Sequence, residues 1–345
     1  MTFQTNAGTA GGRLQYLDLL KTLLVWGMIA AHVIQLLGFG LKPWHQAYSD
    51  FINLVTFSGF MFAFGLGVGL PSSGTSSRQK TLWQRLWPAL LLLLAVYASS
   101  IAFVVLADRK PLTPERLADL LSMRVLFGWS EFLASFFVLY LVIATARPAL
   151  LWIGRNPFAL IAAVGLCLLS TRLVVSINLP LLAAVVGTTN FASFPILAYL
   201  PWFLVGIYLG GQPLKWWHFA IGLGATAGFY LFARQLGEFP QRFPPSALWV
   251  IGPALFLLLY LAVAKAVAAR IVLPAALLLP GRHVLSFLLL SNLVIFTVRY
   301  FLRQPVRDTW QVVLVTLAIM IAISGFWVIA DALRRPRTPA AAAAG

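Results

Sequence analysis

Long apolar stretches recur along almost the whole chain and are separated by short polar connectors. Each stretch is about 20 residues long, which is the length an α-helix needs to cross the hydrocarbon core of a bilayer. About ten such spans are expected, over residues 17–38, 49–70, 87–107, 121–146, 157–175, 195–211, 215–235, 246–269, 283–301 and 309–331. The alternation of a membrane β-barrel is missing. The pattern therefore predicts an all-α, polytopic bundle in which each helix satisfies its own backbone hydrogen bonds.

The two ends of the chain differ from the apolar body. Residues 1–12 and 334–345 are low-complexity segments that we expect to be disordered. Residues 13–333 are predicted to form one transmembrane domain, because neither an internal repeat nor a second domain is evident. The first apolar stretch follows a polar arm, has about full membrane length and lacks a small-residue cleavage site, so we expect no cleavable signal peptide.

Composition and charge agree with a membrane protein. Of 345 residues, 61% are hydrophobic and only 10% are charged, whereas a soluble domain carries about 25% charged residues. The formal charge is +16, but the basic residues lie mostly in connectors, which favours membrane lipids over nucleic acid as partners. They are more frequent on the side of the N-terminus, so both termini are predicted to be cytoplasmic, in an inner or plasma membrane. The single Cys167 provides no disulfide or zinc site, and we expect no metal.

The first apolar stretch carries an unusual set of polar residues for a membrane helix. Lys21 and His32 are eleven residues apart, so on a helix they lie on nearly the same face, about 16 Å apart along the axis. Asp18 falls within the same stripe. In one interpretation Asp18 and Lys21 form an interfacial pair and His32 bonds to a neighbouring helix. In the other, His32 is a general base for an alcohol or amine.

Further polar residues could contribute to the interior of the bundle. Arg124 and Glu131 are seven residues apart, which predicts that they share one face of the span 121–146. His45 lies in the short connector before the second span, and its role stays open between loop structure and a functional site. Charged groups at membrane depth cost at least about 2.5 kcal/mol each, so they usually pair or line a cavity.

Several motifs resemble those of the membrane acyltransferase-3 superfamily, including its heparan-glucosaminide N-acetyltransferase-like branch. "RLQYLDLLKTLLVWGMIAAH" resembles the opening Arg, "LDxLR" and later histidine of that family. "FINLVTFSGF", "FPILAYLPWFLVGIYLGG", "FPPSALWVIGPAL" and "LLPGRHVLSFLLLSNLVIF" resemble four further family segments in the same order. Two positions depart from the family pattern: Lys21 stands where arginine is usual, and Ser291 stands where the family has a histidine.

The resemblance implies transfer of an acyl group, usually acetyl, from acyl-coenzyme A to a hydroxyl or amine of a cell-envelope or exported glycan. His32 would be the general base or acyl relay, with His45 as second choice, and Lys21 would support the polar network or the donor's phosphates. Basic residues expected to meet the anionic donor are Arg13, Arg124 and Arg282, with Asp18 and Glu131 in the same polar interior.

Two alternatives remain. The same polar residues could line the path of a transporter or lipid-linked glycan flippase, which would move substrate without consuming thioester. A non-catalytic relative would bind no donor. The enzyme interpretation requires Lys21 and His32 to face one water-accessible cavity, rather than lipid or separate packed interfaces. The sequence does not indicate the oligomeric state.

Overall fold

The computed structural model describes residues 14–70, 82–125, 129, 131–173, 175–176, 178–190, 192–302 and 304–334. These residues form a bundle of helices without a β-strand, apart from one isolated bridge between Gly38 and Val306. The expected disordered ends, residues 1–12 and 334–345, fall outside the described residues except for the last residue of the final helix, so that expectation is not addressed.

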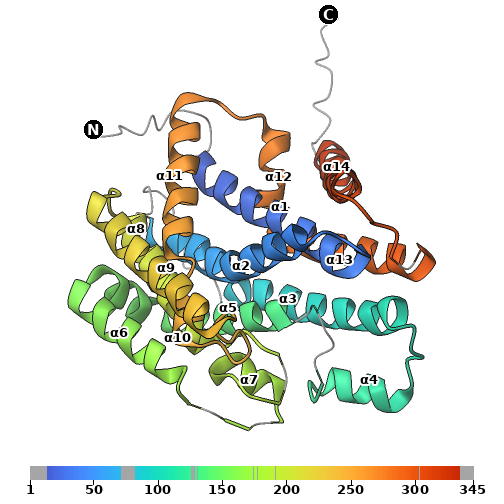
Figure 1. The fold of residues 1–345 in the computed structure, drawn as a ribbon, viewed down its shortest axis with the longest axis horizontal. Helices are drawn as coiled ribbons and strands as arrows, with labels where there is room; N and C mark the ends of the chain where they lie inside the picture. The colour runs from blue at the N-terminus through green and yellow to red at the C-terminus, as the bar shows by residue number, and fades with distance from the viewer. Residues whose placement is uncertain are drawn as a thin grey trace, which may run out of the picture.

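The helices follow the apolar stretches closely (Figure 1). In chain order they are α1 Gln15–Leu37, α2 Pro43–Gly69, α3 Leu82–Ala102 with a π-helical extension Phe103–Ala107, α4 Pro114–Leu121, α5 Glu131–Arg155, α6 Pro157–Ser170, α7 Pro180–Val186, α8 Ile196–Gly210, α9 Trp216–Leu236, α10 Ala247–Ile251, α11 Ala254–Arg270, a 3-10 turn Ala275–Leu278, α12 Leu279–Arg282, α13 Val284–Leu302 and α14 Thr309–Arg334.

Within the described residues, 7 helices are long and apolar enough to cross a membrane. They are α1, α2, α3 with its extension, α5, α10 with α11, α13 and α14. The expected count of about ten is not reached. Of the other three predicted spans, α6 and α8 are shorter apolar helices, and α9 has the length but not the hydropathy. The chain is therefore an all-α membrane protein. Its described residues contain 7 helices that are long and apolar enough to cross the membrane.

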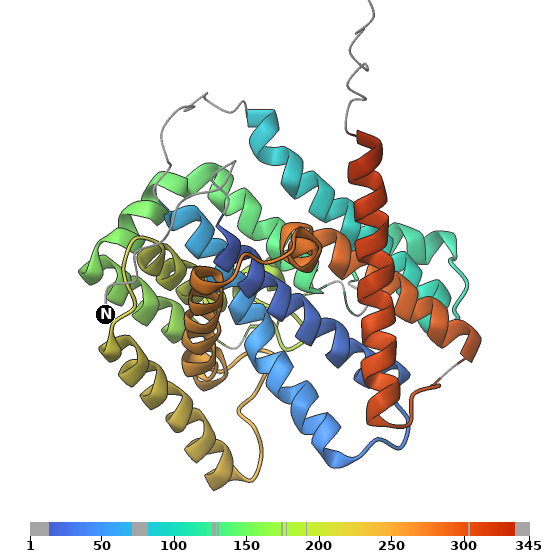
Figure 2. The same cartoon turned by 90° about the horizontal axis from the view of Figure 1, so that it is seen from above.

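α1 and α2 occupy the middle of the bundle. They are the most buried of the 7 spans, and Figure 2 shows both (blue) between α5 and α6 (green) on one side and α13 and α14 (orange to red) on the other. α1 packs against α2, α11, α12, α13 and α14. A polar stripe on α1 therefore faces protein on most sides instead of lipid.

Small residues bring α2 and α8 into close contact. Gly65 and Gly69 on α2 are four residues apart, as are Gly206 and Gly210 on α8. A Cβ added at Gly65 would lie 2.0 Å from the carbonyl oxygen of Phe203, so no larger residue fits without a shift of the backbone. This is the small-residue spacing by which membrane helices approach closely, because lipid provides no hydrophobic force to press them together.

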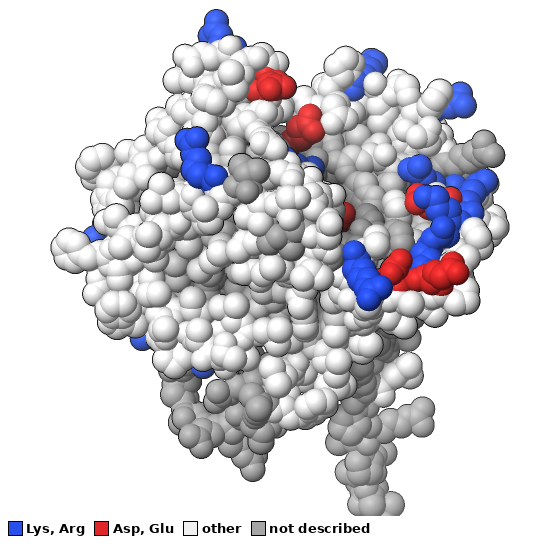
Figure 3. Space-filling model, turned by 90° about the horizontal axis from the view of Figure 1, so that it is seen from below, with Lys and Arg blue, Asp and Glu red and all other residues white. Residues whose placement is uncertain are grey.

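On the face seen from below (Figure 3), the charged side chains gather in small areas. From below, most of the surface is uncharged, and a hollow opens beside a group of acidic and basic side chains on the side where α4 lies (Figure 3). In that region Lys110 pairs with Asp108 at 3.1 Å and Arg124 lies 3.9 Å from Asp119. An uncharged belt with charges at its edge is typical of a protein embedded in lipid.

Candidate active site

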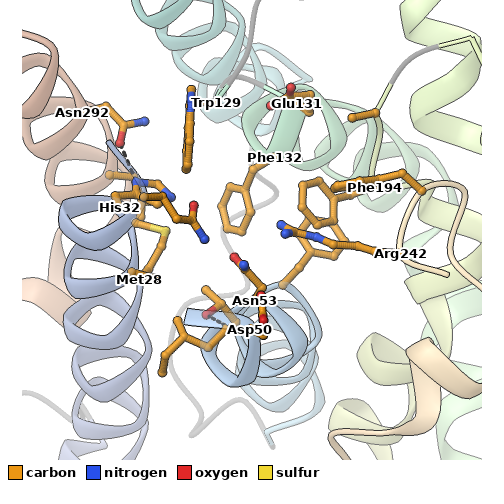
Figure 4. Close-up of a pocket in the computed structure, with 18 of the residues that line it drawn as sticks. Met28, His32, Asp50, Asn53, Trp129, Glu131, Phe132, Phe194, Arg242 and Asn292 are labelled. Atoms are coloured by element: carbon orange, nitrogen blue, oxygen red, sulfur yellow. Dashed lines mark hydrogen bonds between the residues drawn. The ribbon is translucent and has the colours of Figure 1, made fainter. Parts of the chain in front are cut away.

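His32 faces a cavity of about 420 Å³ in the half of the bundle where α1 ends. We call this cavity the His32 pocket. Its walls come from α1, α2, α5, α13 and the connectors before α8 and α10, and its lining residues include Met28, His32, Gln35, Asp50, Asn53, Trp129, Glu131, Phe132, Phe194, Arg242, Phe243 and Asn292 (Figure 4). Its size is within the range of small-molecule sites, which is roughly 300–1,000 Å³.

Asn292 on α13 fixes the orientation of the His32 ring. Nδ1 of His32 lies 2.8 Å from Oδ1 of Asn292 (Figure 4). Because an amide oxygen can only accept, Nδ1 carries the hydrogen and Nε2 of the neutral ring keeps its lone pair. Within the described residues Nε2 makes no hydrogen bond, and the ring lies edge-on to Trp129 with centroids 4.5 Å apart. His32 therefore presents a basic nitrogen to the pocket.

Arg242 enters the His32 pocket from the connector between α9 and α10. The backbone N–H of Ser246 donates to the carbonyl of Gln241 at 2.9 Å, which closes the turn that carries Arg242. The guanidinium lies over the rings of Phe243 and Phe194, at 4.6 and 5.6 Å from their centroids. Burial lowers the pKa of Arg242, although nearby acidic groups act in the opposite direction. Figure 4 shows Arg242 and His32 on opposite sides of the pocket.

A second cavity, of about 390 Å³, contains Lys21 and is called the Lys21 pocket here. Its polar and basic lining residues come from α1 and from the segment around α12, and they include Lys21, Arg282, His283 and Ser286. The remaining walls are largely apolar or aromatic, for example Phe64, Phe136 and Tyr140. Lys21 and Arg282, both cationic, make this cavity suitable for an anionic ligand.

Asp18 anchors the basic segment to α1. Its carboxylate is buried and lies 3.2 Å from Nε of Arg282. The backbone N–H of Gly281 donates to the hydroxyl of Thr22 at 3.0 Å. A Cβ at Gly281 would lie 1.9 Å from the carbonyl oxygen of Asp18, so only glycine allows this approach. Asp18 therefore holds Arg282 at the rim of the Lys21 pocket, and the sequence-based expectation of an Asp18–Lys21 pair omitted this partner.

The sequence left open whether Lys21 and His32 face one cavity, and in the structure they do not. They line two neighbouring cavities, because the side chains of Phe132, Leu133 and Leu288 belong to the walls of both. These three residues come from the start of α5 and from α13. Neither Lys21 nor His32 lies in a solidly packed interface; each faces a cavity, and the two cavities adjoin across an apolar wall.

His45 lies outside both cavities. Pro43 begins α2 earlier than expected, so His45 is in the first turn of the helix and not in a loop. Its Nδ1 donates to the carbonyl of Lys42 at 3.1 Å, its Nε2 lies 3.2 Å from the Thr309 hydroxyl, and its ring stacks on Trp44 at 3.7 Å. With 2% of its surface exposed, His45 joins the starts of α2 and α14.

The prediction that Arg124 and Glu131 share one helix face is wrong. α5 begins at Glu131, and Arg124 lies in the turn after α4, where Met123 adopts a left-handed backbone (φ 52°). The Arg124 side chain is 74% exposed and lies beside Asp119. Glu131 lines the His32 pocket. Arg13, the other predicted donor-binding residue, is outside the described residues.

Three pocket residues escaped the sequence analysis as members of a site. They are Arg242, which is one of many basic residues in connectors, Asn292, which is a polar residue within an apolar stretch, and Asp50, which begins no recognisable motif. The available signal was the position of Arg242 directly before the segment "FPPSALWVIGPAL".

Comparison with known proteins provides no family assignment. No family model, no curated protein and no solved structure matches the chain. Within the described part of the chain, no group of three or more His, Cys, Asp or Glu side chains could hold a metal ion.

Proposed function

We propose that this protein is a membrane acyltransferase that moves an acyl group, acetyl being the simplest, from acyl-coenzyme A to a hydroxyl or amine of a cell-envelope glycan. One observation carries the proposal. A histidine with a free Nε2 faces a polar cavity that adjoins a second cavity carrying Lys21 and Arg282. A base for the acceptor and cations for the donor are the two requirements of this reaction.

The two cavities would divide the substrates between them. Coenzyme A carries several phosphate charges, and Lys21 and Arg282 are the cations that would meet them. Both residues line the Lys21 pocket, and the contact of 3.2 Å with Asp18 holds Arg282 in place there. With both termini proposed to be cytoplasmic, the Lys21 pocket lies in the cytoplasmic half of the bundle and the His32 pocket in the opposite half.

The proposed step is a direct transfer. Nε2 of His32 takes the proton from the acceptor hydroxyl or amine as its oxygen or nitrogen attacks the thioester carbonyl. The bond between the carbonyl carbon and sulfur breaks, and the coenzyme A thiolate leaves and takes up a proton. The hydrogen bond from Nδ1 to Asn292 supports the imidazolium that forms. The thioester would have to reach past the wall of Phe132, Leu133 and Leu288, so this wall must yield to the acyl-bearing end of the donor.

The test is release of the coenzyme A thiol by purified protein given acetyl-coenzyme A and a panel of glucose, glucosamine and glucuronate. His32→Ala should lower acceptor-dependent release by about 10²- to 10⁴-fold, the contribution of a positioned general base. The matched control is His218→Gln, because His218 lies on α9 and outside both cavities. Full activity of His32→Ala would refute the proposal.

A transporter or flippase is the second candidate, and one observation favours it. Two cavities that meet at an apolar wall are also the arrangement expected for alternating access from either side of a membrane. A transporter would move a labelled sugar across proteoliposomes without any release of coenzyme A. Thiol release that depends on a sugar acceptor excludes it as the principal activity.

A further inference from the structure

Arg242 is the one Lys or Arg side chain among the described residues that line the His32 pocket, and the proposed transfer gives it no role. Within the described residues it makes no hydrogen bond and no ion pair, and its Nε is buried without a hydrogen-bond partner. Its contacts are the faces of Phe194 and Phe243. The side chain points into the pocket, toward the side occupied by His32 (Figure 4).

A guanidinium remains charged at every physiological pH, so Arg242 keeps its positive charge inside this aromatic wall. Two aromatic faces partly stabilise a cation, but they satisfy none of its five N–H donors. A neutral sugar that filled the pocket would displace water from the guanidinium and could offer it only hydroxyl acceptors, which make weaker hydrogen bonds than an anion does. The carboxylates of Asp50 and Glu131 also line the pocket and favour the charged guanidinium, but among the described residues neither forms an ion pair with it. An anion seated directly against Arg242 would satisfy its N–H donors better than a neutral group.

One acidic residue of the pocket, Asp50, can be assigned a different role. Asp50 already accepts a hydrogen bond from Nε2 of Gln46 at 2.9 Å, and Asn53 presents an amide beside it. These groups suit the hydroxyls of a sugar, while Phe57, Phe132 and Phe194 offer apolar faces to its ring. The planar fork of Arg242 matches a carboxylate or a phosphate in bidentate geometry.

From this arrangement we infer that the acceptor is acidic: a sugar unit that carries a carboxylate or phosphate, held by Arg242 so that its nucleophile faces His32. This inference rests on the proposed function, because only an acyltransferase would use the bound sugar as an acceptor. Binding of the acidic sugar itself does not require catalysis. Arg242 is then a specificity-determining residue, which selects anionic sugars over neutral ones.

Binding is measured by isothermal titration calorimetry on the full chain in neutral phosphatidylcholine nanodiscs, without acyl-coenzyme A. The probes are glucuronate, glucose 6-phosphate, glucose and inorganic phosphate. At least one acidic sugar should bind about tenfold or more tightly than glucose, the scale of one charge-assisted hydrogen bond. Tighter binding of glucuronate would indicate that the site takes a carboxylate, and tighter binding of glucose 6-phosphate would indicate that it takes a phosphate.

Three variants assign the preference to Arg242. Arg242→Gln should abolish the preference, and Arg242→Lys, which keeps the charge but not the fork, should keep part of it. Arg234→Gln is the control, since Arg234 is exposed on α9 and lines neither pocket. Each variant is first compared with the original chain by size-exclusion elution and thermal unfolding, and the lysine variant provides the test if the glutamine variant does not fold.

Equal binding of glucose and both acidic sugars, binding of none of them, or a preference unchanged in Arg242→Gln and Arg242→Lys would overturn the inference. Inorganic phosphate binding as tightly as the sugar phosphate would also overturn it, because the site would then take the anion alone. Acidic-sugar binding that depends on Arg242, together with no release of coenzyme A, would leave the binding site standing and refute only acyl transfer.

Discussion

The hydrogen bond between His32 and Asn292 gives the sharpest prediction about the chemistry. Asn292→Leu removes the only described partner of His32 Nδ1, at a position that is 3% exposed and 260 residues away along the chain. The ring then loses the acceptor that keeps its hydrogen on Nδ1. The fraction of rings that present a free Nε2 lone pair to the pocket should therefore fall.

The magnitude follows from the strength of that bond. A neutral hydrogen bond contributes a net free energy of about 0.5–1.5 kcal/mol, which corresponds to a factor of about 2–13 in population. Asn292→Leu should lower acceptor-dependent release of coenzyme A by that factor, whereas His32→Ala should lower it by about 10²- to 10⁴-fold. Asn292→Asp keeps an oxygen acceptor at the same position and should remain more active than Asn292→Leu.

A double-mutant cycle separates a positioning role from a merely structural one. If Asn292 acts through His32, the double variant His32→Ala with Asn292→Leu should be no slower than His32→Ala alone. The pH dependence of thiol release is recorded for each active variant, because the loss of a hydrogen bond to the general base alters that profile, whereas a packing defect away from the base does not. Additive losses in the cycle, or an unchanged rate in Asn292→Leu, would refute the reasoning.

The remaining predictions concern stability and the role of the second histidine. Gly206→Ala places a Cβ 2.3 Å from a backbone oxygen of α2 and should lower the free energy of unfolding by about 1–3 kcal/mol. The control is Gly224→Ala, whose added Cβ meets nothing within 4 Å and should not lower the melting temperature in detergent. Asp18→Asn removes the carboxylate that pairs with Arg282, so it should weaken binding of coenzyme A or lower the melting temperature. No change in either quantity would contradict the assigned contact. His45→Gln should keep thiol release within about twofold of the original chain while lowering the melting temperature, because its ring contacts lie outside both pockets; a loss as large as that of His32→Ala would make His45 the base.

The resemblance to acyltransferases named His32 as the principal site residue. The structure shows which groups surround this residue. His32 lines a cavity that also holds an acid, an amide and an unpaired guanidinium. The structure also shows where the two positions that depart from the family pattern, Lys21 and Ser291, lie relative to His32. Lys21 faces its own cavity, and the residue that hydrogen-bonds to His32 is Asn292, the neighbour of Ser291.

The sequence alone determined the class of protein and the approximate positions of most helices. Hydropathy is a local property, so stretches of about 20 apolar residues predict helices wherever they occur. Helix ends were less predictable, since they depend on caps and turns. α5 begins at Glu131 and not near residue 121, and α2 begins at Pro43. The stripe on α1 was likewise readable, because Lys21 and His32 lie on one continuous helix.

Only the tertiary structure decided which residues face each other. Asn292 and Arg242 reach the His32 pocket from α13 and from the connector before α10, and no spacing in the sequence relates them to α1. The same packing divided the stripe between two cavities, because Phe132 and Leu288 come between Lys21 and His32 from distant helices. The periodicity of a helix fixes the direction of its own side chains, whereas the composition of a cavity depends on which helices close around it.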